Sequence, residues 1–154
     1  ARSTESAAAE PQDSIVFQLP EKAGGVRGHL ASDPQHALCP SSRNLTDRQL
    51  AMIRDSGGMV GLNFSVSFLR PDGRRIAETG WDAILRQMDH LLRQVGEDHL
   101  GFGSDYDGCT TPDVIGDVTG LPRLLQALAD HGYDRPLLEK LAHRNWLALL
   151  DRTL

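Results

Sequence analysis

A long amphipathic helix between two short apolar segments is the sequence feature that most constrains how this chain can fold. Apolar residues recur at steps of three and four from Trp81 to Val95, which predicts a helix with one continuous apolar face. The apolar runs at 59–64 and 99–104 have the length and composition of strands that are covered on both faces. The connection between them is too long for a hairpin, so the pattern predicts parallel strands and an α/β fold.

Capping residues mark where other helices begin and end. Thr46 and Gln49 form a capping box, which predicts a helix over 47–56 that is ended by Gly57. Thr79 is the expected N-cap of the long helix. Apolar spacing predicts three more helices toward the C-terminus, at 121–130, after Asp134, and at 146–150.

Residues 1–28 differ from the rest of the chain in composition. They are rich in Ala, Ser, Glu, Gln and Gly, and their one short apolar run covers residues 15–19. Too little apolar surface can be buried there to offset the entropy of ordering, which predicts a mostly disordered or loosely attached tail. A short strand at 15–19 is the one element that we expect within it. Residues 29–154 are predicted to form the folded portion.

The overall composition is that of a globular chain and disfavours several kinds of partner. Of the 154 residues, 40% are hydrophobic, and 16 basic against 21 acidic residues give a net charge of −5. An acidic chain without a basic stripe is a poor partner for nucleic acid or an anionic membrane surface. No apolar run approaches the ~18–20 residues of a membrane span and no signal peptide is recognised, so we expect a cytoplasmic protein. For Cys39 and Cys109, free thiols in a reducing compartment are favoured over a disulfide.

The segment 101–108, Gly-Phe-Gly-Ser-Asp-Tyr-Asp-Gly, carries the strongest candidates for chemistry. Functional groups of parallel α/β folds gather at the C-terminal ends of strands, which is where Asp105 and Asp107 lie. If the strand persists, the two carboxylates lie on one side, and such a pair suits proton transfer or metal contact. The alternative is that Asp105 caps the following turn and that Asp107 with Gly108 is turn chemistry. The pattern alone does not decide between these two interpretations.

Arg43, in the loop before the helix at 47–56, is a second candidate. An arginine at the end of a strand can hold a carboxylate through two parallel hydrogen bonds, although a lone loop arginine is more often simply solvated. The histidines show no metal-binding spacing, and His29 and His36 flank this loop without the further ligands that a zinc site needs. No metal ligand is therefore assigned from the residue pattern.

From residue 37 to residue 150 the sequence resembles the membrane dipeptidase (renal dipeptidase) family of zinc peptidases, a branch of the amidohydrolase-like TIM barrels. The resemblance rests on ordered blocks at 37–40, 43–47, 57–64, 88–90, 95–96 and 99–108, and on Asn145 before an apolar helix. It implies a metallo-dependent hydrolase with eight βα units and two zinc ions at the mouth of the barrel. This chain would supply about three of those units, as the C-terminal part of an incomplete barrel.

The resemblance also implies roles for the two candidates. Arg43 matches the family's arginine that holds the free carboxylate of the substrate. Asp105 matches the acidic residue near the metal-bridging water, which would relay a proton to the leaving amine. A dipeptide is thus the expected substrate, zinc the expected cofactor, and zinc-dependent hydrolysis of dipeptides the expected function of the family.

Most of the family's zinc ligands have no counterpart in this sequence. A His-x-Asp pair and a bridging glutamate belong to the first half of the barrel, and Ser32 or Asp33 stands where a later histidine is expected, with His36 as a displaced alternative. We therefore expect incomplete zinc binding and no dipeptidase activity from this chain alone. Two alternatives stay open: a noncatalytic remnant or interaction module that forms homo-oligomers through exposed barrel edges, and one half of a split dipeptidase completed by a second chain.

Overall fold

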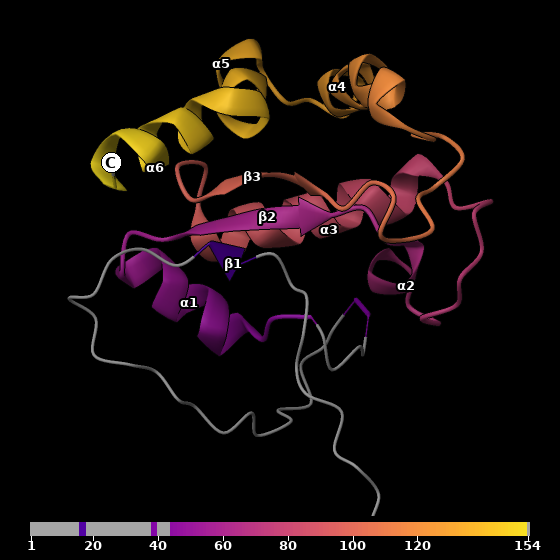
Figure 1. The fold of residues 1–154 in the computed structure, drawn as a ribbon, viewed down its shortest axis with the longest axis horizontal. Helices are drawn as coiled ribbons and strands as arrows, with labels where there is room; N and C mark the ends of the chain where they lie inside the picture. The colour runs from indigo at the N-terminus through magenta and orange to yellow at the C-terminus, as the bar shows by residue number, and fades with distance from the viewer. Residues whose placement is uncertain (1–15, 18–37, 40–43, 154) are drawn as a thin grey trace, which may run out of the picture.

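A three-stranded sheet in the order β1-β2-β3 runs through the middle of the structure (Figure 1). The computed structural model describes residues 16–17, 38–39 and 44–153. The strands are β1 (Val16–Phe17), β2 (Met59–Asn63) and β3 (Leu100–Ser104). β2 and β3 pair in parallel, whereas β1 pairs antiparallel with β2.

Helices cover the sheet on both sides. Those before β3 are α1 (Asp47–Asp55), α2 (Val66–Leu69) and α3 (Trp81–Val95). After β3 come the 3₁₀ turn η1 (Val118–Gly120), α4 (Leu121–Asp130), α5 (Arg135–Glu139), the π-helical turn η2 (Lys140–Arg144) and α6 (Asn145–Thr153). In Figure 1, α1 lies below the strands, and α4, α5 and α6 lie above them.

The parallel pair predicted for the two apolar runs is confirmed. Val60 pairs with Leu100, and α3 forms the connection between the two strands. The short strand expected at 15–19 is present as β1 over residues 16–17. The prediction of a disordered tail falls on residues 1–15 and 18–28, which lie outside the described residues.

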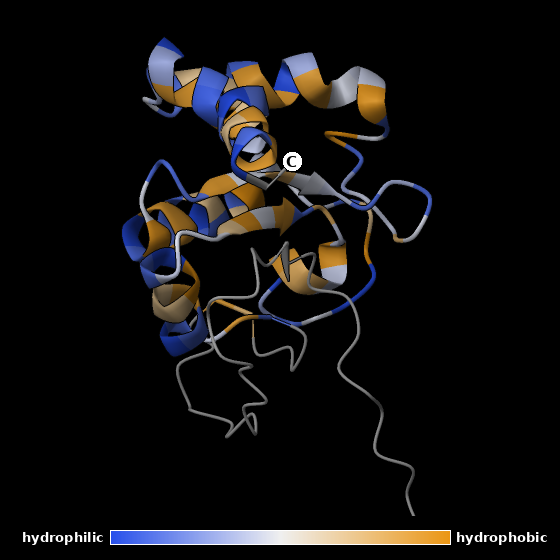
Figure 2. Ribbon diagram, turned by 60° about the vertical axis from the view of Figure 1, so that its left-hand side comes forward, coloured by the Kyte–Doolittle hydropathy of each residue, from blue (hydrophilic) through white to orange (hydrophobic). Residues whose placement is uncertain are grey.

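The hydrophobic core lies between the sheet and the helices. The apolar face of α3 buries Ala83, Ile84, Met88 and Val95, as the periodicity predicted. Figure 2 shows hydrophobic residues along β2 and in bands along the helices, between hydrophilic ones. Burying a large aliphatic side chain of this kind contributes about 1.5–3 kcal/mol. The core therefore fixes where the two parallel strands end.

The predicted helix caps are confirmed at α1 but not at α3. The Thr46 hydroxyl accepts a hydrogen bond from the Gln49 backbone at 3.3 Å, and the Gln49 side chain accepts one from the Thr46 backbone at 2.9 Å. Thr79 is not the N-cap of α3, because Gly80 takes that position without any side-chain hydrogen bond. The Thr79 hydroxyl instead donates to the Ile76 carbonyl at 2.6 Å, so its hydrogen bond lies within the loop before α3 and not at the helix N-terminus.

A π-helical turn sets the last helix against the strands. It directs the buried Asn145 side chain back to the start of β3, where Nδ2 donates to the carbonyls of Glu97 (2.6 Å) and Leu100 (2.8 Å). The next residue, Trp146, lies against Gly101, where its ring occupies the space that a side chain would need. The turn thus secures the amino-terminal end of β3, at the opposite end of the strand from Ser104.

Candidate functional site

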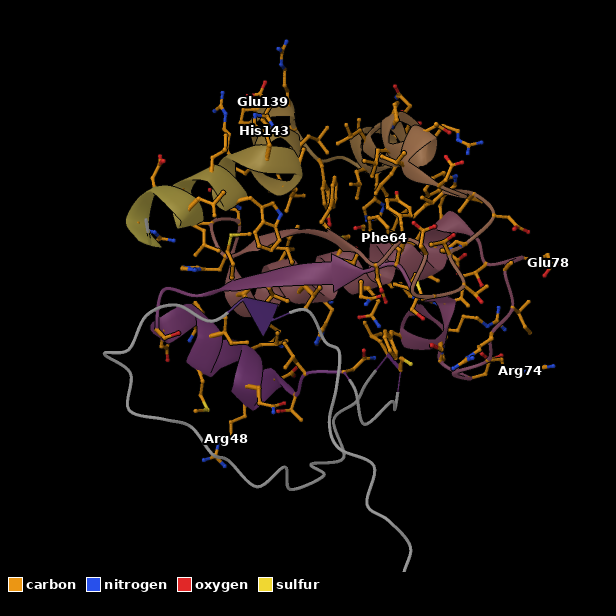
Figure 3. The ribbon with its side chains drawn as sticks, viewed as in Figure 1. Arg48, Phe64, Arg74, Glu78, Glu139 and His143 are labelled. Atoms are coloured by element: carbon orange, nitrogen blue, oxygen red, sulfur yellow. The ribbon has the colours of Figure 1, made fainter. Side chains whose placement is uncertain are left out.

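Polar side chains gather where the two parallel strands end. Asn63 is the last residue of β2, and Asp105 directly follows β3. Figure 3 shows Phe64 at this end of β2, whereas Glu139 and His143 lie on the helices above the sheet. Because the ends of parallel strands meet at one edge, these two loops form the candidate site.

A β-bulge at Gly103 decides which residues reach this edge. Leu62 pairs with Phe102 and Asn63 pairs with Ser104, so Gly103 is the extra residue in β3. A Cβ atom on Gly103 would lie only 2.9 Å from the Gly61 carbonyl carbon, so the two backbones approach too closely for a side chain. Bulges of this kind re-aim the residues that follow them. Here the bulge brings Asp105 to the edge, just past the pair formed by Asn63 and Ser104.

The backbone after β3 turns sharply into the left-handed region. The φ angles are +49° at Ser104, +76° at Asp105 and +66° at Asp107. The strand therefore does not persist past Ser104, so the condition under which Asp105 and Asp107 would share one strand face is not met, and Asp107 lies in a turn, as the alternative interpretation has it. Such angles are uncommon outside glycine and are tolerated best by aspartate and asparagine. Each costs of order 1–3 kcal/mol in strain, and such strain concentrates at functional sites.

The Asp105 carboxylate is held by an amide from the neighbouring strand. Asn63 Nδ2 donates to Asp105 Oδ2 at 2.9 Å, and Asn63 Oδ1 accepts the backbone N–H of Ser65 at 2.7 Å. Asp105 Oδ1 lies against Gly108, where an added Cβ would collide with it, and the Cys109 thiol also forms a side-chain hydrogen bond to the Asp105 carboxyl group. The Asp107 side chain is exposed and makes no hydrogen bond to another described residue, as expected of a turn aspartate.

Tyr106 anchors this turn to the core. Its ring packs edge-on against Phe64, with centroids 5.9 Å apart. Burial, and then the charge of Asp117, raises the pKa of the Tyr106 phenol, so the group stays neutral. Within the described part of the chain, its buried hydroxyl has no hydrogen-bond partner. The contact between its ring and Phe64 indicates that Tyr106 packs against the core and so holds the turn in place.

Cys39 and Cys109 form no disulfide with each other, in agreement with the interpretation as thiols. The Cys109 thiol donates to the Asp105 carbonyl at 3.2 Å, and the Cys39 thiol donates to the Ser67 carbonyl at 3.3 Å. Burial raises the pKa of the Cys109 thiol, and the charge of Asp105 adds to this effect. A protonated thiol is a poor nucleophile, so Cys109 supports the backbone of the turn rather than covalent chemistry.

The loops after the two strands are joined to each other at this edge. The backbone N–H of Val66 donates to the Thr110 carbonyl at 3.0 Å, and that of Asp113 donates to the Ala77 carbonyl at 2.8 Å. Hydrogen bonds from Arg70 lower the pKa of Asp72 to about 2, so this ion pair stays charged and closes the outer turn of the first loop. Arg74 and Glu78 lie on the same loop in Figure 3.

Arg43 lies outside the described residues, as do His29, Ser32, Asp33 and His36. The structure does describe Asn44, the residue that follows Arg43 in the chain. Asn44 Nδ2 donates to the carbonyls of Cys39 (3.3 Å) and Phe68 (3.1 Å), so the chain on both sides of the Arg43 segment is tied to α2 at the candidate edge.

Three of the described histidines form hydrogen bonds between elements. His90 is hydrogen-bonded to Asp47 at 2.9 Å, His131 to Asp89 at 2.9 Å, and His99 to the Gly58 carbonyl at 2.8 Å. Among residues 38–39 and 44–153, no group of three or more His, Cys, Asp or Glu side chains is arranged to hold a metal ion. These residues do not fit a metal centre by themselves.

Sequence reasoning found Asp105 but missed Asn63 and the bulge at Gly103. The available signal for Asn63 was one polar residue at the end of an otherwise apolar strand. The bulge left no signal in one strand alone, because it exists only relative to the register of the partner strand.

The comparisons with known proteins agree on one family. Residues 31–153 match the model of the membrane dipeptidase family, peptidase family M19. The chain is also similar to the metallopeptidase from Rhodobacter sphaeroides that was crystallised with a phosphinate mimic of the dipeptide L-Ala-D-Ala. The two are 65% identical with a TM-score of 0.76, over 77% of this chain and 34% of that one.

Two curated relatives extend the match. The chain is 51% identical over 142 residues to the uncharacterised protein of the pqqA 5′ region in Klebsiella pneumoniae, covering 88% of this chain and 52% of that protein. It is 32% identical over 148 residues to dipeptidase ataJ of Aspergillus terreus, covering 94% of this chain and 33% of that one. The chain thus spans about half the length of the first relative and a third of the second. No helix within the described residues is long and apolar enough to cross a membrane.

Proposed function

The chain belongs to the membrane dipeptidase family, and from this premise we propose that it takes part in hydrolysing dipeptides as the C-terminal portion of a barrel enzyme. Its fold is an incomplete part of the TIM-barrel-like fold of these peptidases, in agreement with the fold class predicted from the sequence. The observation that carries the proposal is the Asp105 carboxylate, held by Asn63 at the C-terminal edge of the parallel strands.

In this proposal Asp105 carries the proton of the reaction. Asn63 Nδ2 donates to Oδ2 and orients the carboxylate. In this role the carboxylate takes a proton from the attacking water and passes it to the amine nitrogen as the peptide bond breaks. A positioned carboxyl group that transfers a proton in this way contributes about 10²- to 10⁴-fold in rate.

Arg43 is proposed to hold the free carboxylate of the dipeptide. A guanidinium group can donate two parallel hydrogen bonds to a carboxylate, which fixes both the position and the direction of the substrate. Support comes from the adjacent Asn44, whose side chain bonds to the Phe68 carbonyl of α2. Since α2 follows β2 directly, Asn44, the residue after Arg43 in the chain, is attached to the same edge as Asp105.

We propose zinc as the cofactor of the complete site, because a relative that is 64% identical to this chain is a metallopeptidase of family M19. The described residues do not form a metal centre, so most ligands would come from the part of the barrel that this chain does not cover. It follows that the chain alone hydrolyses no dipeptide, and that a longer polypeptide or a complementing chain completes the site.

The proposal can be tested with the purified chain and with a completed barrel. The completed barrel is this chain co-expressed with the part of the Rhodobacter sphaeroides metallopeptidase that the match leaves uncovered. Each is assayed with zinc on a series of dipeptides that includes L-Ala-D-Ala. We expect turnover from the completed barrel only. A folded completed barrel that cleaves none of the dipeptides contradicts the proposed function. Turnover by the chain alone that a chelator abolishes contradicts the proposal that most zinc ligands come from the part of the barrel outside this chain.

A further inference from the structure

Both the oxygen and the nitrogen of the Asn63 side-chain amide form hydrogen bonds, and these fix the orientation of the amide. A backbone N–H can only donate, so the atom that faces the Ser65 N–H at 2.7 Å must be the oxygen, Oδ1. The other end, Nδ2, then faces Asp105 Oδ2 at 2.9 Å and can only donate. The amide therefore presents a hydrogen-bond donor to Asp105 in a single orientation.

The location of this contact separates it from ordinary strand pairing. Asn63 is 9% exposed and stands at the last residue of β2. Its hydrogen bond reaches the residue that follows β3, next to the backbone bond from Phe64 N–H to the Ser104 carbonyl at 2.9 Å. The acceptor, Asp105, has a φ angle of +76°, a conformation that an L-residue keeps only when its surroundings hold it there.

We propose that Asn63 is a positioning residue for Asp105, a role that rests on the proposed function of Asp105 as the proton carrier. The Asn63 amide donates to Oδ2 and holds the carboxylate in one rotamer over a strained turn. Without the amide, the side chain samples other rotamers and the carboxylate no longer faces the reacting atoms in one orientation.

A double-mutant cycle of Asn63→Ala and Asp105→Gly tests the contact in the 154-residue chain. Glycine suits the left-handed backbone, and any strain that it relieves appears in both legs of the cycle and cancels. We expect Asn63→Ala to lower the Tm by about 3 to 8 °C in the original background, and by clearly less when Asp105 is already glycine. Equal shifts in the two backgrounds would show that Asn63 does not hold Asp105.

The same four variants, measured in the completed barrel, test the positioning role. We expect Asn63→Ala to lower kcat about ten- to a hundredfold with KM within twofold, because the partner that orients a reacting group acts on the chemical step. In the Asp105→Gly background, Asn63→Ala should have no further effect on kcat. Additive losses in kcat, or a loss carried by KM, would overturn the proposal.

Asn145→Ala is the matched control. Asn145 is a buried asparagine with two hydrogen bonds, but these lie at the opposite end of β3. It should lower the Tm to a comparable degree, leave kcat unchanged, and show the same Tm shift with or without the Asp105 side chain. A completed barrel without any turnover contradicts the proposed function, whereas the Tm cycle still decides whether Asn63 holds Asp105.

Discussion

The close approach of the two parallel strands at Gly103 makes a sharp prediction about stability. In Gly103→Ala, the added Cβ would lie 2.9 Å from the Gly61 carbonyl carbon, 3.0 Å from its oxygen and 3.1 Å from its Cα. All three atoms belong to the backbone, so no side chain can rotate away, and the strands must move apart or the bulge must be lost. Overpacking of this kind costs about 1–3 kcal/mol. Stretching the hydrogen bond from Phe64 to Ser104 adds about 1 kcal/mol, so we expect a loss of about 3 kcal/mol.

Urea unfolding of the chain measures this loss, with Gly57→Ala as the matched control. Gly57 has a φ of +73° and nothing within 4 Å of an added Cβ, so alanine there introduces backbone strain without a collision. Its expected cost is about 1–2 kcal/mol. The φ angle of Gly103 is not positive, so there alanine introduces a collision without left-handed strain. If Gly103→Ala costs no more than Gly57→Ala, the strands have room at the bulge and the reasoning fails.

Three further predictions concern the turn, pH and a helix cap. Asp107→Gly should raise the free energy of unfolding by about 0.5 kcal/mol or leave it unchanged, because the φ of +66° suits only glycine without strain. Asp107→Val should lower the free energy of unfolding by about 1–2 kcal/mol for the same reason. The urea midpoints of the two variants check both values. Burial tends to raise the pKa of Asp89, but hydrogen bonds from His131 and Tyr133 outweigh burial and lower it. Since the folded-state pKa lies below the unfolded one, this stabilisation is present above about pH 4 and is lost as the pH falls through the folded-state value. Asp89→Asn should therefore flatten the decrease of the urea midpoint between pH 5 and pH 2, and an unchanged slope would contradict the assignment. Thr46→Ala should lower stability by about 1 kcal/mol and reduce helical circular dichroism at partial unfolding, because it removes the hydroxyl that accepts the Gln49 backbone N–H, while the bond from the Thr46 backbone N–H to the Gln49 side chain remains.

The parts of the fold that were predictable from the sequence are those that local patterns determine. The cap formed by Thr46 and Gln49 and the apolar face of α3 each involve residues within one helix, so their spacing carries the information. The parallel pair followed from the length of the connection between two apolar runs. Thr79 was assigned wrongly because the Ile76 carbonyl in the preceding loop offered its hydroxyl a partner that spacing does not reveal.

The geometry of the candidate site depends on contacts between strands, which spacing within one strand cannot show. Asp105 was found because aspartate after a strand is a recognisable pattern, but its left-handed backbone and its bond to Asn63 arise from the register shift at Gly103. The predicted pairing with Asp107 assumed that the strand continues, and the turn after Ser104 removes that assumption. Arg43 lies outside the described residues, so its role stays a prediction.

The most direct test of the central claim is the kcat of the completed barrel on L-Ala-D-Ala before and after Asp105→Asn. Asparagine keeps the shape of the side chain and tolerates the left-handed backbone, and its oxygen can still accept the hydrogen bond from Asn63, but it cannot carry a proton. We expect kcat to fall by about 10²- to 10⁴-fold while the Tm stays within a few degrees. A kcat that falls less than about tenfold in a folded variant would contradict Asp105 as the proton carrier and with it the proposed mechanism.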